Sequence, residues 1–167
     1  TSGRTVELSG VAKVGEVPYD FARKRLSVIV QENAQEPIII TKGALDNVLA
    51  VCTNIRSKSG IAPLTQAKQD KITQKFTDWG AKGFRVLGVA TKRAKANVSV
   101  TRDDEAGLTF EGFLLFLDPP KTDAVEAIEA LAKLNVQLKI ITGDNRYVAT
   151  HIAEAVGLQS TAILTGA

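Results

Sequence analysis

The chain has 167 residues, of which 44% are hydrophobic and 23% charged, a composition typical of globular proteins that bury a core. Lys and Arg (21) exceed Asp and Glu (18) by only three charges, which does not predict a nucleic-acid partner and leaves a small anionic ligand open. The single cysteine, Cys52, excludes an internal disulfide and a Cys-rich zinc site, and no apolar run reaches the roughly 18 to 20 residues that span a bilayer.

The first part of the chain predicts an α+β unit, an antiparallel sheet with flanking helices. Two runs rich in β-branched residues are separated by a polar stretch, which is typical of paired strands. Apolar residues then recur at helical spacing, before a further strand and a polar loop of mixed charge. The expected elements are strands at residues 26–31 and 37–42, helices at 43–52 and 63–80, a strand at 84–91 and a loop at 92–107.

From residue 108 onward strands and helices alternate, which is typical of a parallel sheet covered by helices. We expect strands at 108–118, 136–142 and 161–166 and helices at 123–134 and 145–156. Pro119 and Pro120 mark a boundary, so the expected domains are residues 1–117 and 118–167. A sheet of this kind carries about five strands, and the second domain supplies two or three. The sequence therefore predicts a piece of a longer protein, and the absence of any methionine agrees.

Two segments carry residue types that suit a phosphorylated ligand. In KIITGDN a predicted strand ends in Thr142, Gly143 and Asp144, and Asn145 is a plausible N-cap of the following helix. A hydroxyl and backbone N–H groups at a strand end suit a phosphoryl group, although a plain tight turn with a helix cap explains the same residues. In VPYDFARKRLSV two aromatic residues precede three cations, so an adenine could stack while the cations meet phosphates. A solvated basic run beside two core aromatics is the alternative.

Other candidates are weaker when taken alone. Lys42 precedes Gly43 at a predicted strand end, where the glycine lets a ligand approach the backbone, and Arg85 is a cation on a predicted strand. The DPPK segment that begins at Asp118 predicts a stiff joint, or simply an ordinary turn. The usual phosphate-loop, dinucleotide and HExxH signatures do not occur, so no metal ligand is assigned, and His151 is read as a surface or packed histidine.

Five segments in this order resemble the large cytoplasmic loop of P-type ATPases: PYDFARKRLSV, TKGAL, FRVLGVAT, FLDPPK and ITGDN. Each motif is weak alone, but the ordered set is specific. GFLLFLDPPK, together with KGAL, looks most like the bacterial magnesium-translocating subgroup. The resemblance implies most of the nucleotide-binding domain up to residue 117, followed by the beginning of a phosphorylation domain with a haloacid dehalogenase-like α/β fold.

The resemblance also implies roles for particular residues. Tyr19 takes the place of the aromatic residue that stacks on adenine, Lys24 that of the lysine five positions later, and Lys42 with Gly43 that of the lysine and glycine lining the adenine pocket. Arg85 matches the arginine that reaches the phosphates. Asp118 matches the hinge aspartate, and Thr142, Gly143 and Asp144 match the loop that contacts the phosphoryl group.

For the parent protein the resemblance implies a membrane pump that hydrolyses Mg-ATP through an aspartyl phosphate and moves a cation, with this stretch at the cytoplasmic face. Its expected partners are ATP or ADP and the rest of the pump, meaning the remaining phosphorylation domain, the actuator domain and the transmembrane helices. The chain has neither DKTGT nor GDGxND, so by itself it is expected to bind nucleotide without hydrolysing it. A stand-alone nucleotide-binding or regulatory module and a haloacid dehalogenase-type phosphatase are the alternatives.

Overall fold

The computed structural model describes residues 9–33, 35–95, 100–117, 119–143, 145–158 and 164. The chain divides into two compact units, residues 1–66 with 87–114 and residues 67–86 with 115–167. The domain boundary expected between residues 117 and 118 stays a prediction. None of the helices in the described part of the chain is long and apolar enough to cross a membrane.

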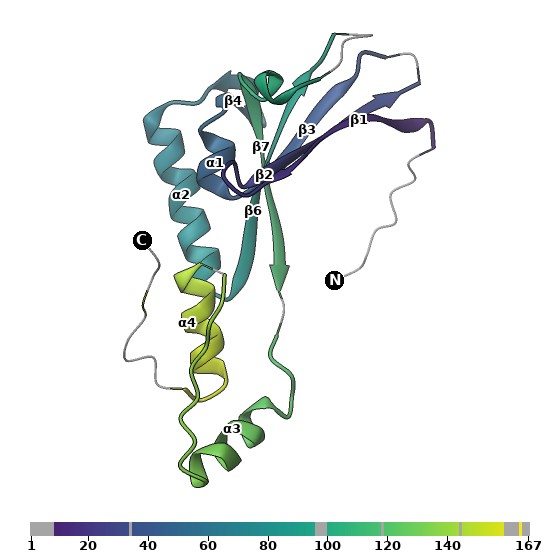
Figure 1. The fold of residues 1–167 in the computed structure, drawn as a ribbon. Helices are drawn as coiled ribbons and strands as arrows, with labels where there is room; N and C mark the ends of the chain where they lie inside the picture. Colours follow the sequence, from purple (N-terminus) through teal and green to yellow (C-terminus); the bar gives the residue numbers. More distant parts are fainter. Residues whose placement is uncertain are drawn as a thin grey trace. The chain divides into compact units, whose positions relative to one another are not determined.

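One sheet of seven strands dominates the described residues (Figure 1). Its strands are β1 (Val11–Asp20), β2 (Arg25–Glu32), β3 (Ile38–Gly43), β4 (Cys52–Ser57), β5 (Gly60–Pro63), β6 (Phe84–Arg93) and β7 (Leu108–Leu117). The helices are α1 (Leu45–Leu49), α2 (Gln66–Ala81), the 3-10 turn η1 (Arg102–Asp104), α3 (Ala124–Lys133) and α4 (Arg146–Ala155).

The strand order is β1-β2-β3-β6-β7-β4-β5. β1, β2, β3 and β6 pair antiparallel in succession, as do β4 and β5, but β4 pairs with β7 in parallel. The sheet is therefore mixed, and the expectation of a purely antiparallel sheet was wrong. The sequence also predicted that the first helix extends to residue 52, whereas α1 ends at Leu49, and it did not predict β1, β4 or β5. The apolar residues of α1 continue into Val51 and Cys52, which hides the start of β4.

The two faces of the sheet differ in the first compact unit. Ser27, Thr41 and Ala90 pair across β2, β3 and β6, and all three are buried. Helix α1 covers this face, because a Cβ on Gly88 of β6 would stand only 3.3 Å from the Cβ of Val48. The opposite face carries the alternate residues of the same strands and is more open, since side chains alternate between faces along a strand.

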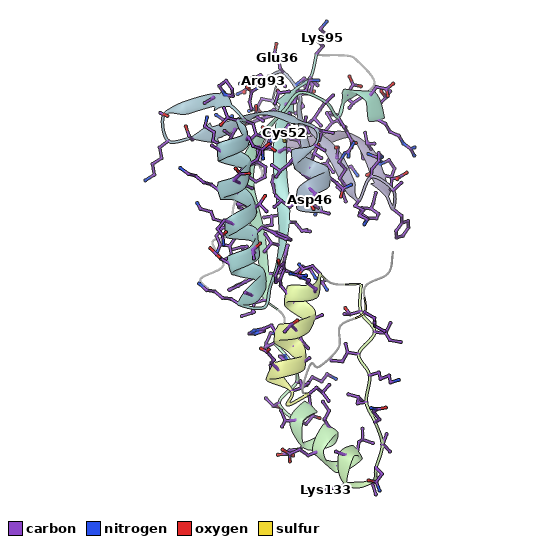
Figure 2. All side chains as sticks on the ribbon, turned by 90° about the vertical axis from the view of Figure 1, so that its left-hand side faces the viewer. Glu36, Asp46, Cys52, Arg93, Lys95 and Lys133 are labelled. Atoms are coloured by element: carbon purple, nitrogen blue, oxygen red, sulfur yellow. The ribbon has the colours of Figure 1, made fainter. Side chains whose placement is uncertain are left out.

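The far ends of β3 and β6 are tied together. The Ala94 N–H donates to the Pro37 carbonyl over 2.8 Å. A guanidinium nitrogen of Arg93 lies 3.6 Å from a carboxylate oxygen of Glu36, and both residues are labelled at one end of the sheet in Figure 2. Both side chains are exposed, so this pair contributes at most about 1 kcal/mol.

The second compact unit departs from the expected α/β pattern. α3 and α4 form close to the expected positions, but residues 136–142 form no strand and are exposed, Ile141 almost completely. The strand expected at 161–166 lies outside the described residues except for Leu164, which is not in a strand. The expectation at 136–142 was wrong because a strand needs a neighbouring strand to satisfy its backbone N–H and C=O groups. The haloacid dehalogenase-like fold is therefore not shown.

Candidate functional site

A tight turn joins β1 to β2 and carries several of the predicted site residues. An Asp20 carboxylate oxygen accepts hydrogen bonds from the N–H groups of Ala22 and Arg23, each over 2.9 Å. These bonds, that from Arg23 first, lower the pKa of Asp20. The Lys24 N–H donates to the Asp20 carbonyl over 2.7 Å and closes the turn. Asp20 therefore fixes the backbone that presents Lys24.

Lys24 has a positive φ of 48°, a region that residues other than glycine rarely adopt. Its carbonyl accepts a hydrogen bond from the Ala44 N–H over 2.9 Å. A Cβ on Gly43 would stand 2.3 Å from that same carbonyl oxygen and 2.6 Å from the Cβ of Arg25. The sequence singled out Gly43 for close approach of a ligand, and the structure shows that it admits the backbone of this turn.

Tyr19 lies on β1 and Lys42 on β3, the two strands that flank β2 (Figure 1), and Lys24 lies in the turn that joins β1 to β2. Val17 pairs with Ser27 and Asp20 with Arg25, so that Pro18 and Tyr19 together stand opposite Leu26. Leu26 in turn pairs with Lys42, and Lys42 with Val89. The structure therefore brings an aromatic residue and an ammonium group into one cross-strand row, next to the turn that holds Lys24.

The aromatic end of this row is open to solvent. The Tyr19 side chain is 49% exposed and Phe21 is 86% exposed. Their rings meet edge to face, with centroids 5.3 Å apart and planes at 89°, an arrangement that aromatic pairs favour. Lys42 is exposed as well. An aromatic surface beside exposed cations can accept a planar base that carries phosphate groups.

A fully buried carboxylate, which sequence reasoning missed, stands behind the same turn. Glu105 is 2% exposed and accepts a hydrogen bond from Ser27 Oγ over 2.6 Å and one from Arg25 Nε over 3.0 Å. Arg23 donates to the same carboxylate through Nη1. Burial alone would raise the pKa of Glu105, but the bonds from Ser27, Arg23 and Arg25 outweigh it and hold the pKa below its ordinary value. Glu105 is therefore ionised at neutral pH.

The remaining predicted residues belong to the second unit or lie outside the described residues. Arg85 is exposed on β6 in the second unit, and Thr142 and Gly143 are exposed in a segment without regular secondary structure. Asp118 and Asp144 lie outside the described residues. The predicted cap of α4 is confirmed, because the Asn145 side chain accepts from the N–H groups of Tyr147 (3.0 Å) and Val148 (3.1 Å). His151 is half-buried on α4.

Within the described ranges no three His, Cys, Asp or Glu residues are grouped so that they could hold a metal ion. What the site offers is an exposed ring, exposed ammonium groups and a rigid turn.

Comparison with known proteins decides the family. A family profile described as "P-type ATPase, cytoplasmic domain N" matches residues 7–123. The chain belongs to the P-type ATPases. It is 41% identical over 159 residues to "Magnesium-transporting ATPase, P-type 1" of Salmonella typhimurium (strain LT2) and 38% identical over 155 residues to the protein of that name in Escherichia coli (strain K12), in each case over 92% of this chain.

A third relative comes from an animal. The bovine "Calcium-transporting ATPase type 2C member 1" is 34% identical over 149 residues and 87% of the chain. The chain spans 17% of the length of the two bacterial relatives and 14% of the bovine one. Residues 7–123 match the cytoplasmic N domain, and the two bacterial alignments extend over 92% of the chain. These matches confirm the predicted family and the predicted likeness to magnesium-transporting relatives.

Proposed function

We propose that this chain is the ATP-binding part of a cation pump that moves Mg²⁺ across a membrane. The observation that carries the proposal is the cross-strand row of Tyr19, Leu26 and Lys42 beside the turn that holds Lys24. An exposed ring next to exposed ammonium groups is what a nucleotide requires. The relatives named as magnesium-transporting ATPases over 92% of the chain favour a pump over a stand-alone module or a soluble phosphatase.

Each residue of the row has a separate task in this proposal. The ring of Tyr19 stacks on adenine, which contributes roughly 1 to 3 kcal/mol. Lys42, on the other side of Leu26 in the row, lines the adenine pocket, and Gly43 admits the turn. Lys24 and Arg85 meet the phosphates. Because phosphoryl transfer is catalysed mainly by positioning and charge neutralisation, this grip on Mg-ATP is the contribution of residues 1–117.

The segment after the hinge would receive the phosphoryl group in the complete pump. Asp118 serves as the hinge, and Thr142, Gly143 and Asp144 contact the phosphoryl group. The aspartate that becomes phosphorylated belongs to a part of the pump that this sequence does not contain, since DKTGT is absent. The chain alone therefore binds nucleotide without hydrolysing it. Its partners are the rest of the phosphorylation domain, the actuator domain and the membrane helices, and its location is the cytoplasmic face of the membrane.

The test is a titration of the chain with ATP and with ADP, followed by amide chemical shifts. One stacked base with two or three exposed cations gives roughly 4 to 5 kcal/mol, which corresponds to a dissociation constant of roughly 0.2 to 1 mM. We expect saturable shifts around Tyr19, Lys24 and Lys42 that Tyr19→Ala and Lys42→Ala abolish. Lys58→Ala removes an exposed ammonium from the turn between β4 and β5 and serves as the matched control.

Two outcomes would count against the proposal. Absence of saturable shifts at several millimolar nucleotide in the unmodified chain would exclude binding by this chain. Equal losses of affinity in Lys58→Ala and Lys42→Ala would show that the nucleotide senses only the overall charge of the protein, and not this row of residues.

A further inference from the structure

The backbone conformation of Lys24 is enforced by its surroundings. A residue other than glycine keeps a φ of 48° only where neighbouring contacts hold it there. On the N-terminal side the Lys24 N–H is bonded to Asp20, and the Lys24 carbonyl accepts from Ala44. The two neighbours in sequence, Arg23 and Arg25, are both bonded through their side chains to Glu105. Lys24 therefore sits between two fixed residues.

Glu105 forms the one anchor that Arg23 and Arg25 share among the described contacts. Its side chain has no solvent exposure, and those of Arg23 and Arg25 are 16% and 13% exposed. Both guanidinium groups bond the same carboxylate oxygen, Oε2, while Ser27 Oγ occupies Oε1 and is itself 2.7 Å from Thr41 Oγ1. A neutral side chain at position 105 would remove the charge that both largely buried cations share, and would leave Arg23 with its hydrogen bond to the Pro18 carbonyl and Arg25 with its hydrogen bond to the Asn47 carbonyl. Loss of the shared charge favours release of the two guanidinium groups to water.

Lys24 differs in its contacts from the two cations that flank it. Arg23 and Arg25 turn toward the buried carboxylate, while Lys24 makes only backbone hydrogen bonds among the contacts described and is exposed. An ammonium on a long flexible stem contributes to binding in proportion to how well its backbone is fixed beforehand. The arrangement therefore separates anchoring cations from a cation that is left available for a ligand.

We propose that Glu105 is a positioning residue for nucleotide binding, which holds Lys24 toward the phosphates by fixing Arg23 and Arg25. The inference rests on the proposed function. Glu105 itself does not touch the nucleotide and acts only through the turn. Loss of its charge loosens the turn, and Lys24 then spends part of its time away from the phosphates.

The test is a double-mutant cycle on the complete 167-residue chain, with Glu105→Gln, Lys24→Ala and the double variant. Dissociation constants for ADP and for adenosine are measured by amide shift titration. We expect Glu105→Gln to weaken ADP binding roughly three- to tenfold and adenosine binding less than about twofold, because only ADP has phosphates for Lys24 to meet. In the Lys24→Ala background the same substitution should weaken ADP binding less than about twofold.

Glu111→Gln is the matched control. Glu111 is a partly buried carboxylate that is likewise bonded to an arginine and a hydroxyl, Arg56 Nε over 2.6 Å and Thr91 Oγ1 over 2.7 Å, but neither partner belongs to the turn. We expect ADP affinity to change by less than about twofold in this variant. The inference is overturned if Glu105→Gln weakens the affinity for ADP and for adenosine equally. It is also overturned if the substitution weakens ADP affinity equally in the presence and in the absence of the Lys24 side chain. Either result would mean that Glu105 has only a structural role.

Two further results keep the inference separate from the proposed function. If the unmodified chain fails to bind ADP, the proposed function falls and this inference falls with it. If ADP binds and Glu105→Gln behaves as the unmodified chain does, only the inference falls. Should Glu105→Gln not fold, as judged by its amide spectrum, Arg25→Lys takes its place, because it keeps the charge and removes the Nε bond to Glu105. That variant must show the same selective loss for ADP.

Discussion

The carbonyl oxygen of Lys24 lies 2.3 Å from the position that a Cβ on Gly43 would occupy. The obstructing atom belongs to the backbone, and the next nearest are the Cβ and Cα of Arg25 at 2.6 and 2.7 Å. Gly43→Ala must therefore push β3 away from the turn. We expect it to lower the free energy of unfolding by about 1–3 kcal/mol, the usual cost of overpacking. Urea unfolding measures this as a lower midpoint at an unchanged slope.

Gly15→Ala is the control for this substitution. Its Cβ would meet Ile29 Cδ1 at 3.4 Å, an ordinary contact with a side chain, and Gly15 is not among the glycines with positive φ. The expected change in the free energy of unfolding is therefore below about 1 kcal/mol in either direction. Equal destabilisation by the two substitutions would contradict the close approach between Gly43 and Lys24.

The buried carboxylate of Glu105 predicts a dependence of stability on pH. Its pKa in the folded chain lies below the ordinary value of 4.5, with burial opposing the shift and Ser27, Arg23 and Arg25 producing it. A group whose pKa is lowered by folding contributes stability above its unfolded pKa and loses it as pH falls through the folded one. At pH 7, Glu105→Gln should therefore cost on the order of 3 kcal/mol, because it leaves buried cations unpaired.

The same reasoning fixes how this cost changes with pH. As pH falls below about 4.5, the carboxylate of the unmodified chain becomes protonated, and its advantage over glutamine shrinks. Urea unfolding of the unmodified chain and of Glu105→Gln at several pH values between 7 and 3 gives the difference in their free energies of unfolding. The effects of all other titrating groups cancel in this difference. A difference that stays constant over this range would contradict an ionised, stabilising Glu105.

Sequence patterns predicted the local elements of the first unit better than their pairing. Runs of β-branched residues located β2 and β3. These patterns could not predict the parallel pairing of Cys52 with Leu108, because nothing in either segment specifies a partner so distant in sequence. In the second unit the apolar pattern at 136–142 predicted a strand, but no strand forms there. An apolar run of this kind becomes a buried strand only when neighbouring strands are present to pair with it.

In the candidate site, too, some residues could be predicted from sequence and one could not. Tyr19, Lys24 and Lys42 were predicted because they lie in short motifs, and their places on β1, in the turn and on β3 follow from strand pairs that the sequence partly specified. Glu105 was missed because it lies in a polar loop of mixed charge, and its contact with Ser27 joins residues 78 positions apart. Only the three-dimensional fold distinguishes this buried glutamate from the other acidic residues in the loop.

The N-cap of α4 gives a prediction for the second unit. The Asn145 side chain accepts from two N–H groups of the first turn, which otherwise lack partners within the helix. Asn145→Ala should destabilise α4 by about 1 kcal/mol, whereas Asn145→Asp keeps an accepting oxygen and should change the stability little. Amide hydrogen exchange of residues 147–155 reports the effect, as a rise in exchange rate confined to the alanine variant. Faster exchange in both variants would contradict the capping role.

Cys52 gives a prediction about chemical reactivity. Burial raises the pKa of its thiol from an ordinary value of 9.0 to about 12, and Sγ lies 3.2 Å from the Val48 carbonyl, to which it donates. Since the thiolate is the nucleophile, the folded chain at pH 8 should react with iodoacetamide about three orders of magnitude more slowly than the chain in urea. Mass spectrometry of timed samples gives both rates. A folded-state rate within tenfold of the rate in urea would show that Cys52 is accessible as a thiolate, and that β4 does not bury it against α1.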